Sequence, residues 1–128
     1  MKFNSLIPEL SVSNIEKSKI FYISLGFELV YERVNDKFCF LQLKGNQIML
    51  EELNNNWNTG DLKYPFGRGI NISMSINNIE DFYNNLRNKN LAMFKELEMH
   101  KYKVNEKIFC DKEFLLQDPD GYLLRFNN

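Results

Sequence analysis

The C-terminal segment LLQDPDGYLLRFNN contains a charged residue that needs a chemical explanation. DPDG is a tight-turn signal, and the apolar runs on either side predict the two strands of a hairpin. In the second strand Leu124 and Phe126 share one face, whereas Arg125 lies on the other. A guanidinium on a partly buried sheet face needs a carboxylate, because an unpaired buried charge costs several kcal/mol. The alternation along the first and fourth strands allows Glu9 or Glu51 to lie on the same face as Arg125. We therefore predict that Arg125 forms an ion pair with one of them, and this pair would be either purely structural or in contact with a ligand.

The residue types that most often carry out chemistry are scarce. His100 is the only histidine, and its surroundings predict a solvated strand. Cys39 and Cys110 stand among aromatic residues in KFCFL and IFCDK, which predicts two reduced core thiols rather than a disulfide or a metal pair. We find no nucleophilic triad, no phosphate loop and no basic patch for nucleic acid.

The composition is that of an ordinary globular protein. The chain has 128 residues, of which 44% are apolar and 26% charged, and a net charge of −1. A net charge of −1 does not favour binding to nucleic acid or to anionic lipid. The sequence also contains no apolar run of the signal-peptide or membrane-spanning type. We therefore expect one domain, residues 1–128, in the cytoplasm and without a nucleic-acid or membrane partner.

The sequence repeats itself after 64 residues, since SVSNIE at 11–16 returns as SINNIE at 75–80. Ser13 with Glu16 fits a helix-capping box, and Asn77 with Glu80 repeats the pattern. Helical periodicity follows both signals, and three strand-like runs follow each helix. We predict two βαβββ modules, about 1–53 and about 70–128, joined by a connecting loop of about 54–69.

The alternation of side chains along the first strand of each module predicts which face packs on the helix. The helix-facing sets are Leu6, Pro8, Leu10 and Val12, and Ile70, Ile72, Met74 and Ile76. The opposite sets are Ile7, Glu9 and Ser11, and Asn71, Ser73 and Ser75. The fold class is α+β, a curved mixed sheet around a cavity with the helices outside. The more polar face would line that ligand cavity or, equally well, face solvent.

Three segments resemble the vicinal oxygen chelate superfamily, which includes glyoxalase I, fosfomycin-resistance proteins, extradiol dioxygenases and bleomycin-resistance proteins. They are LIPELSVSNIEKSKIFYISLGFELVYE, GINISMSINNIEDFYNNL and FLLQDPDGYLLRF. The resemblance covers nearly the whole chain. It implies paired βαβββ modules and a two-fold homodimer with cavities formed by both chains.

The superfamily's enzymes hold a divalent metal with side chains from the first, fourth, fifth and eighth strands. The corresponding positions here are Ile7, Glu51 or Glu52, Asn71 and Arg125. Isoleucine and protonated arginine have no lone pair to donate, so we expect no metal and no other cofactor.

The resemblance is then greatest to the metal-free bleomycin-resistance proteins, which sequester a drug by stacking aromatic rings on it and neutralising its charge. It implies a protein that binds an aromatic or heterocyclic antibiotic or metabolite, with no catalytic residues. Candidate contacts are the inner-face and loop residues Glu9, Phe38, Phe40, Glu51, Trp57, Phe66, Asn71, Ser73, Tyr102, Glu113 and Arg125.

Two other functions remain open. The first is a glyoxalase-like isomerase or dioxygenase with a non-standard site, or an acid–base enzyme that uses Glu51 or Glu113. The second is a structural or protein-interaction domain with a filled cavity.

Overall fold

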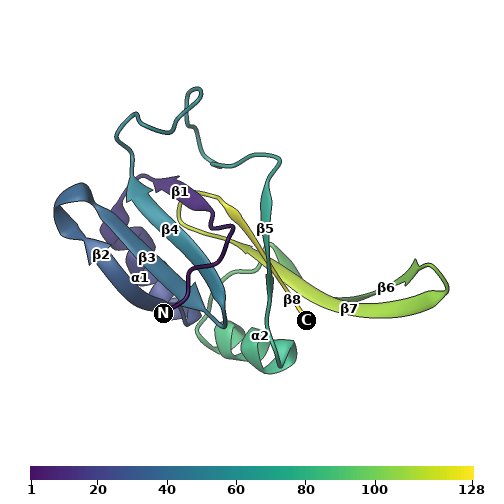
Figure 1. Ribbon diagram of the computed structural model, residues 1–128. Coiled ribbons are helices and arrows are strands. Elements are labelled where there is room, and N and C mark those ends of the chain that lie inside the picture. Colours follow the sequence, from purple (N-terminus) through teal and green to yellow (C-terminus); the bar gives the residue numbers. More distant parts are fainter. The chain divides into compact units, whose positions relative to one another are not determined.

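A computed structural model describes all residues 1–128 and shows two α-helices and eight strands (Figure 1). The strands form two four-stranded mixed sheets, one in each half of the chain. The chain divides into two compact units, residues 1–66 with 118–121 and residues 67–117 with 122–128. The predicted α+β fold of two βαβββ modules is confirmed.

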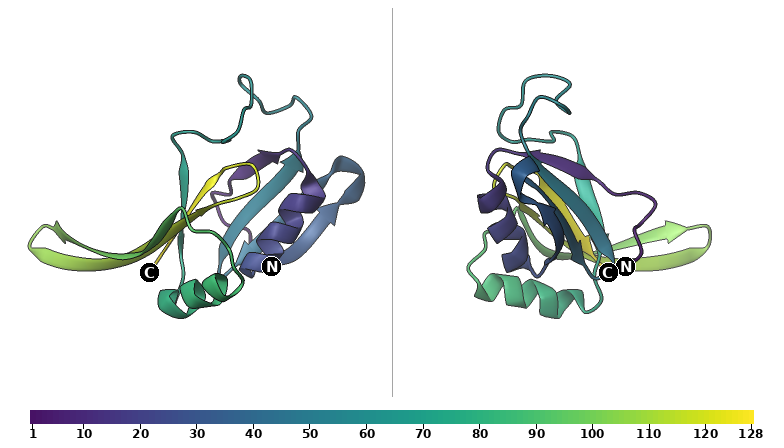
Figure 2. Two further views of the ribbon diagram at one scale, coloured as in Figure 1. Left: turned by 180° about the vertical axis from the view of Figure 1, so that it is seen from behind. Right: turned by 60° about the vertical axis from the view of Figure 1, so that its left-hand side comes forward.

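The first unit contains one helix packed on one sheet. Its elements are β1 (Glu9–Val12), α1 (Ile15–Leu25), β2 (Glu28–Arg33), the short 3-10 helix η1 (Val34–Asp36), β3 (Phe38–Leu43) and β4 (Asn46–Glu52). The strand order is β1-β4-β3-β2, in which β1 is parallel to β4 and the other neighbours are antiparallel. Figure 2 shows α1 along one face of this sheet, where it packs on β3 and β4.

The second unit repeats this topology. Its elements are β5 (Asn71–Ser75), α2 (Ile79–Asn88), β6 (Lys95–Val104), β7 (Lys107–Gln117) and β8 (Leu123–Asn127), and the strand order is β5-β8-β7-β6. Again only the first and last strands run parallel. The β6–β7 hairpin is longer than its counterpart, with strands of 10 and 11 residues where β2 and β3 have 6 each.

The predicted alternation agrees with the burial of the two first strands. Leu10 and Val12 are buried in the first unit, and Met74 and Ile76 are buried in the second. Leu6 and Ile70 are exposed because they precede the strands. The helix-facing positions of the two modules thus form two similar cores.

The predicted capping box is wrong by one residue. The N-cap of α1 is Asn14, whose side chain accepts a hydrogen bond from the N–H of Lys17 at 3.0 Å. Ser13 is engaged elsewhere, since its N–H and hydroxyl donate to the two carboxylate oxygens of Asp120 at 3.0 and 2.5 Å. In α2 the N-cap is Asn78 rather than Asn77, and it makes no side-chain capping bond.

The DPDG segment connects β7 to β8 as predicted, but it also fastens the first unit. The Tyr22 hydroxyl donates to Asp118 at 2.8 Å, and both residues are buried. Gly121 has φ +94°, and a Cβ there would lie 2.6 Å from the Cα of Pro65. The two aspartates of the turn therefore bind the first unit at two points. Asp118 binds Tyr22 of α1, and Asp120 binds Ser13, which precedes the N-cap.

The connecting segment contains no helix or strand between Leu53 and Ile70, as predicted. Trp57 and Tyr64 are exposed, whereas Phe66 is buried and its N–H donates to the carbonyl oxygen of Asp120 at 2.8 Å. Neither helix has the length and apolar character needed to cross a membrane.

The two cysteines differ in environment, and both are free thiols. Cys39 is fully buried on β3, as predicted, and burial raises the pKa of its thiol to about 11. Cys110 is exposed on β7, so the prediction of a core thiol is wrong there. Its aromatic neighbour Phe109 belongs to an exposed ribbon rather than to the core.

Candidate functional site

The face of the first sheet opposite α1 brings acidic and aromatic side chains together. The strand register aligns two rows across the four strands, and we call these eight residues the aromatic–acid face. The rows are Glu9, Met49, Phe40 and Tyr31, and Ser11, Glu51, Phe38 and Arg33. Four predicted site residues, Glu9, Phe38, Phe40 and Glu51, therefore share one surface.

The aromatic rings of this face are closely packed. Tyr31 stacks on Phe40 with ring centroids 5.3 Å apart, and Phe3 meets the same ring edge-on at 5.3 Å. The guanidinium carbon of Arg33 lies 3.9 Å from the ring centroid of Phe38. Phe38 and Phe40 are buried, so an incoming molecule would meet Tyr31, which is 38% exposed, before either phenylalanine.

Sequence reasoning missed Tyr31 and Arg33. A register shift between Leu29 and Tyr31 sets which side chains of β2 face this surface. The alternation of Tyr31 and Arg33 in FELVYERV is the signal that could have identified them.

The two acids of the aromatic–acid face are neighbours. Glu51 is 9% exposed and accepts a hydrogen bond from the Asn54 side chain. Burial is the main cause that raises the pKa of the Glu9 carboxyl, followed by repulsion from Glu51 and a hydrogen bond with it, while attraction to Arg33 partly offsets these effects. The Glu9 carboxyl, repelled by Glu51, thus favours a bound proton or a nearby cation.

A pocket of about 450 Å³ opens beside Glu51. It is lined by the ends of β2 and β4, by η1 and by the start of the connecting segment, namely Arg33, Asn35, Asp36, Lys37, Glu51, Glu52, Leu53, Asn54 and Asn56.

Most charges in this pocket are already paired. Glu52 binds Lys37 at 2.8 Å, which lowers the pKa of Glu52, and Arg33 binds Asp36 at 3.1 Å. The hydrogen bonds of Glu51, in contrast, join it to an amide and to a second carboxyl group. Glu51 is accordingly the acid best placed to receive a positively charged group.

On the corresponding face of the second sheet, Arg125 forms an ion pair with a different acid from the two that the sequence predicted. Its partner is Glu113 on β7, with the Nε–Oε2 distance at 2.6 Å, and not the predicted Glu9 or Glu51. Leu115 faces Arg125 across the strand pair, which places Glu113 one step along the same face. The β7–β8 register determines this partner, and alternation along one strand does not give that register.

The histidine belongs to the same cluster. His100 is half exposed on β6, consistent with the predicted strand, and its Nε2 lies 3.2 Å from Glu98 and 3.3 Å from Glu113. These two acids are not evident from the sequence around His100, because Glu113 lies across the hairpin and Glu98 lies two residues along the strand.

The remaining predicted residues are dispersed. Ser73 lies opposite Arg125 and accepts a hydrogen bond from Asn127 at 2.7 Å. Asn71 is exposed, Tyr102 stacks on Phe109 in the hairpin, and Trp57 is 61% exposed.

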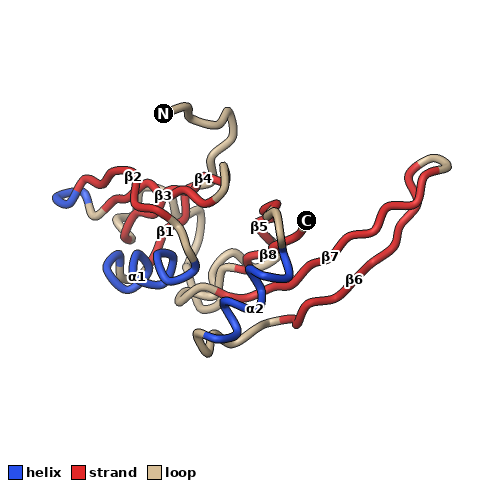
Figure 3. The backbone as a smooth tube through the Cα atoms, turned by 90° about the horizontal axis from the view of Figure 1, so that it is seen from below, coloured by secondary structure: helices blue, strands red, loops and turns tan.

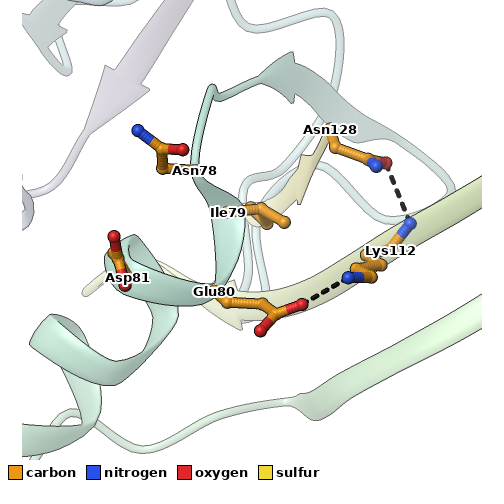
Figure 4. A pocket seen from close by; sticks show the side chains of 6 residues that line it. All are labelled: Asn78, Ile79, Glu80, Asp81, Lys112 and Asn128. Atoms are coloured by element: carbon orange, nitrogen blue, oxygen red, sulfur yellow. Dashed lines mark hydrogen bonds and ion pairs between the residues drawn. The ribbon is translucent and has the colours of Figure 1, made fainter.

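A second pocket, of about 360 Å³, lies at the start of α2 (Figure 4). Glu80 pairs with Lys112 across it, and the Lys112 N–H donates to the Asn128 side chain at 2.9 Å. These contacts tie α2 and the chain end to β7, which is a structural role.

Comparison with known proteins identifies the class. The family described as the Glyoxalase/Bleomycin resistance protein/Dioxygenase superfamily matches residues 3–126, and the chain belongs to it. A superfamily member from Vibrio splendidus 12B01 is 33% identical over 93% of each chain, with a TM-score of 0.43. Comparison with curated proteins gave no match.

Two further structures resemble this chain in fold. TioX from Micromonospora sp. ML1 is 11% identical over 98% of each chain, with a TM-score of 0.76. A glyoxalase/bleomycin resistance protein/dioxygenase from Alicyclobacillus acidocaldarius is 19% identical over 97% of this chain and 89% of its own, with a TM-score of 0.69.

The metal positions implied by the superfamily do not fit a divalent ion. Ile7 has no donor atom, and Arg125 brings a positive charge that is paired with Glu113. Of the two fourth-strand candidates, Glu51 lies on the aromatic–acid face, while Glu52 binds Lys37 and the N–H of Ile15. No three His, Cys, Asp or Glu side chains are arranged to hold a metal.

Proposed function

We propose that the protein binds a positively charged aromatic or heterocyclic molecule, an antibiotic or a metabolite, on the aromatic–acid face without a metal. The observation that carries this proposal is Glu51, a buried carboxylate beside a pocket, bonded to an amide and to the carboxyl group of Glu9. A cation would replace the repulsion between the two acids with attraction. The ring of Tyr31 offers it a flat apolar surface.

The other predicted residues enter the proposal with different roles. Glu9, Phe38 and Phe40 complete the binding face around Glu51. Trp57 follows the pocket residue Asn56 in the connecting segment and could close over a ligand. Phe66, being buried, would hold that segment in place.

In the second unit we retain the polar and aromatic residues as proposed contacts. They are Asn71, Ser73, Tyr102, Glu113 and Arg125. Members of this superfamily commonly form dimers, and we propose that two copies of this chain associate as well. We also propose a cytoplasmic location, supported by the two free thiols, and a role in antibiotic resistance.

Calorimetric titration of the chelator-treated protein with metal-free bleomycin tests the proposal. We expect saturable binding at one drug per protomer and, for Glu51→Gln, an affinity reduced by roughly thirtyfold or more, as for a buried charge contact. Glu28→Gln is the matched control, because Glu28 is an exposed acid of β2 outside the pocket. It should bind like the wild type.

A second probe covers the case in which bleomycin is the wrong drug. Proflavine, a flat aromatic cation, presents the charge and ring surface that the aromatic–acid face should recognise. Failure of both probes to bind, or equal binding by Glu51→Gln, would contradict the proposal.

The raised pKa of Glu9 favours one alternative, a metal-free acid–base enzyme, since a carboxyl group that holds its proton longer can act as a general acid. Recovery of the bound probe distinguishes the two functions. A binding protein returns it unchanged, whereas an enzyme returns a product.

A further inference from the structure

We infer that the end of the β6–β7 hairpin, residues 101–110, binds the first unit of a second copy of this chain. We call these ten residues the ribbon tip. The inference rests on the proposed self-association and adds the surface that mediates it.

The ribbon tip extends beyond its own sheet. Strand β8 pairs with β7 only from Glu113 to Gln117, whereas β6 and β7 pair as far as Val104 and Lys107. Figure 3 shows the two strands continuing as a ribbon past β5 and β8. A two-stranded ribbon on its own is marginally stable in water, so this segment needs a surface to pack against.

All ten residues of the ribbon tip are exposed, including four large apolar side chains. These are Tyr102 at 50%, Val104 at 47%, Ile108 at 74% and Phe109 at 44%. A cluster of exposed apolar side chains rimmed by charges is typical of a protein interface.

Apolar side chains occur on both faces of the ribbon. Tyr102 and Phe109 pair across the strands and stack, with ring centroids 5.7 Å apart. Ile108 lies opposite Lys103, and Lys101 lies opposite Cys110, on the other face. A partner that covered only one face would leave the apolar side chains of the other face exposed. The ribbon tip is therefore suited to insertion into a partner surface that contacts both faces.

Charge selects the partner. The ribbon tip has three lysines and one glutamate, whereas the first unit has ten acidic and seven basic side chains. Two ribbon tips facing each other would bring their lysines together, which disfavours that contact. The first unit of a second copy offers opposite charge.

The oligomeric state tests this inference. Sedimentation equilibrium over micromolar to millimolar protein should show a dimer for the wild type. Tyr102→Glu and Phe109→Glu should each weaken association by roughly tenfold or more, as substitutions of aromatic anchors do. Ile70→Glu is the control, because Ile70 is 62% exposed in the second unit outside the ribbon tip and should leave the dimer unchanged.

A charge variant tests the choice of partner. Lys101→Glu combined with Lys103→Glu should weaken association, and added salt should weaken it in the wild type. If ribbon tips paired with each other, charges of the same sign would face each other in the double variant as they do in the wild type. Added salt would then strengthen the wild-type dimer. That outcome would overturn the assignment to the first unit.

Cys110 gives an independent readout, because it lies in the ribbon tip while Cys39 is buried with a raised pKa. Maleimide labelling of Cys110 should slow as the wild-type concentration rises, but not in Phe109→Glu. A wild type that stays monomeric would overturn both the self-association and this inference. A dimer that survives the tip substitutions would overturn only the inference.

Discussion

The two sheets share strand order and connection but differ on the face opposite their helix. In the first sheet this face has buried aromatic rings and a buried carboxylate beside a pocket. In the second it has the exposed Asn71 and Ser73 and the ion pair of Arg125 with Glu113. The helix-facing residues repeat in kind because both cores must be filled. The opposite faces are free to differ, and the first has the features of a binding site.

The hairpins differ as well. In the first unit the β2–β3 hairpin lies within its sheet, and Tyr31 and Phe40 stack on the aromatic–acid face. In the second unit an aromatic pair of the same kind, Tyr102 and Phe109, stacks further out in the hairpin and is exposed beyond the sheet. The same type of pair therefore serves a ligand face in one unit and, by our inference, a partner in the other.

The largest expected loss of stability comes from a substitution in the core part of β7, and the ribbon part of the same strand provides the comparison. Phe114 is fully buried on β7 and contacts the rings of Phe82, Tyr83 and Phe126. Phe114→Ala should lower the free energy of unfolding by about 3–5 kcal/mol, measured by urea denaturation. At protein concentrations at which the chain is monomeric, Phe109→Ala should cost less than about 1 kcal/mol, and equal losses would show that the ribbon tip is part of the folded core.

The next prediction concerns the turn that fastens the first unit. Gly121→Ala forces a side chain onto a backbone with φ +94° and against Pro65, so it should cost about 2 kcal/mol or more. Gly60→Ala is the control, because nothing lies within 4 Å of its added Cβ. Thermal unfolding would show a lower Tm for the first variant alone.

Two tyrosine hydroxyls compare a buried with an exposed hydrogen bond. Tyr22→Phe removes the donor to buried Asp118 and should cost about 1–3 kcal/mol. Tyr83→Phe removes a bond to Glu96, which is largely exposed, and should change stability by less than about 1 kcal/mol. Similar costs for both would contradict the role of the DPDG turn in the first unit.

The smallest effect depends on pH and tests the acid pair. The pKa of Glu9 is raised in the folded protein, so the folded state holds this proton more tightly than the unfolded state does. Stability from this group is present below the ordinary pKa of 4.5 and is lost as pH rises through the raised pKa.

Glu9→Gln, which stays neutral, should therefore match the wild type at low pH and exceed its stability at neutral pH by about 0.5 kcal/mol. Denaturation at both pH values measures the difference, with Glu28→Gln as the control. A variant that is less stable than the wild type at neutral pH would contradict repulsion between Glu9 and Glu51.

Much of the fold follows from the sequence because it depends on local patterns. The 64-residue repeat and the alternation in LSV and ISMSI determine the modules and their helix-facing sides. The predicted start of α1 is one residue too early because Ser13 binds Asp120, which is distant in the sequence. Local capping signals do not include such contacts.

The candidate site was predicted in part. Strand parity places Phe38 and Phe40 on one face, since residues two apart share a face, and the register through β4 brings Glu9 to the same face. The partner of Arg125 depends on strand register, and Tyr31 depends on the irregularity in β2. Parity within a single strand groups Tyr31 with Arg33, but it determines neither the sheet face that this pair takes nor the partner of Arg125.

We propose the aromatic–acid face of the first sheet as the binding surface, and a ligand titration can test this residue by residue. The most direct measurement is a heteronuclear NMR titration of the labelled protein with metal-free bleomycin, and with proflavine if bleomycin does not bind. We expect the largest chemical-shift changes at the amides of residues 38–40 and 49–54. Saturable binding that leaves these amides unchanged and shifts residues 71–75 or 78–81 instead would contradict it.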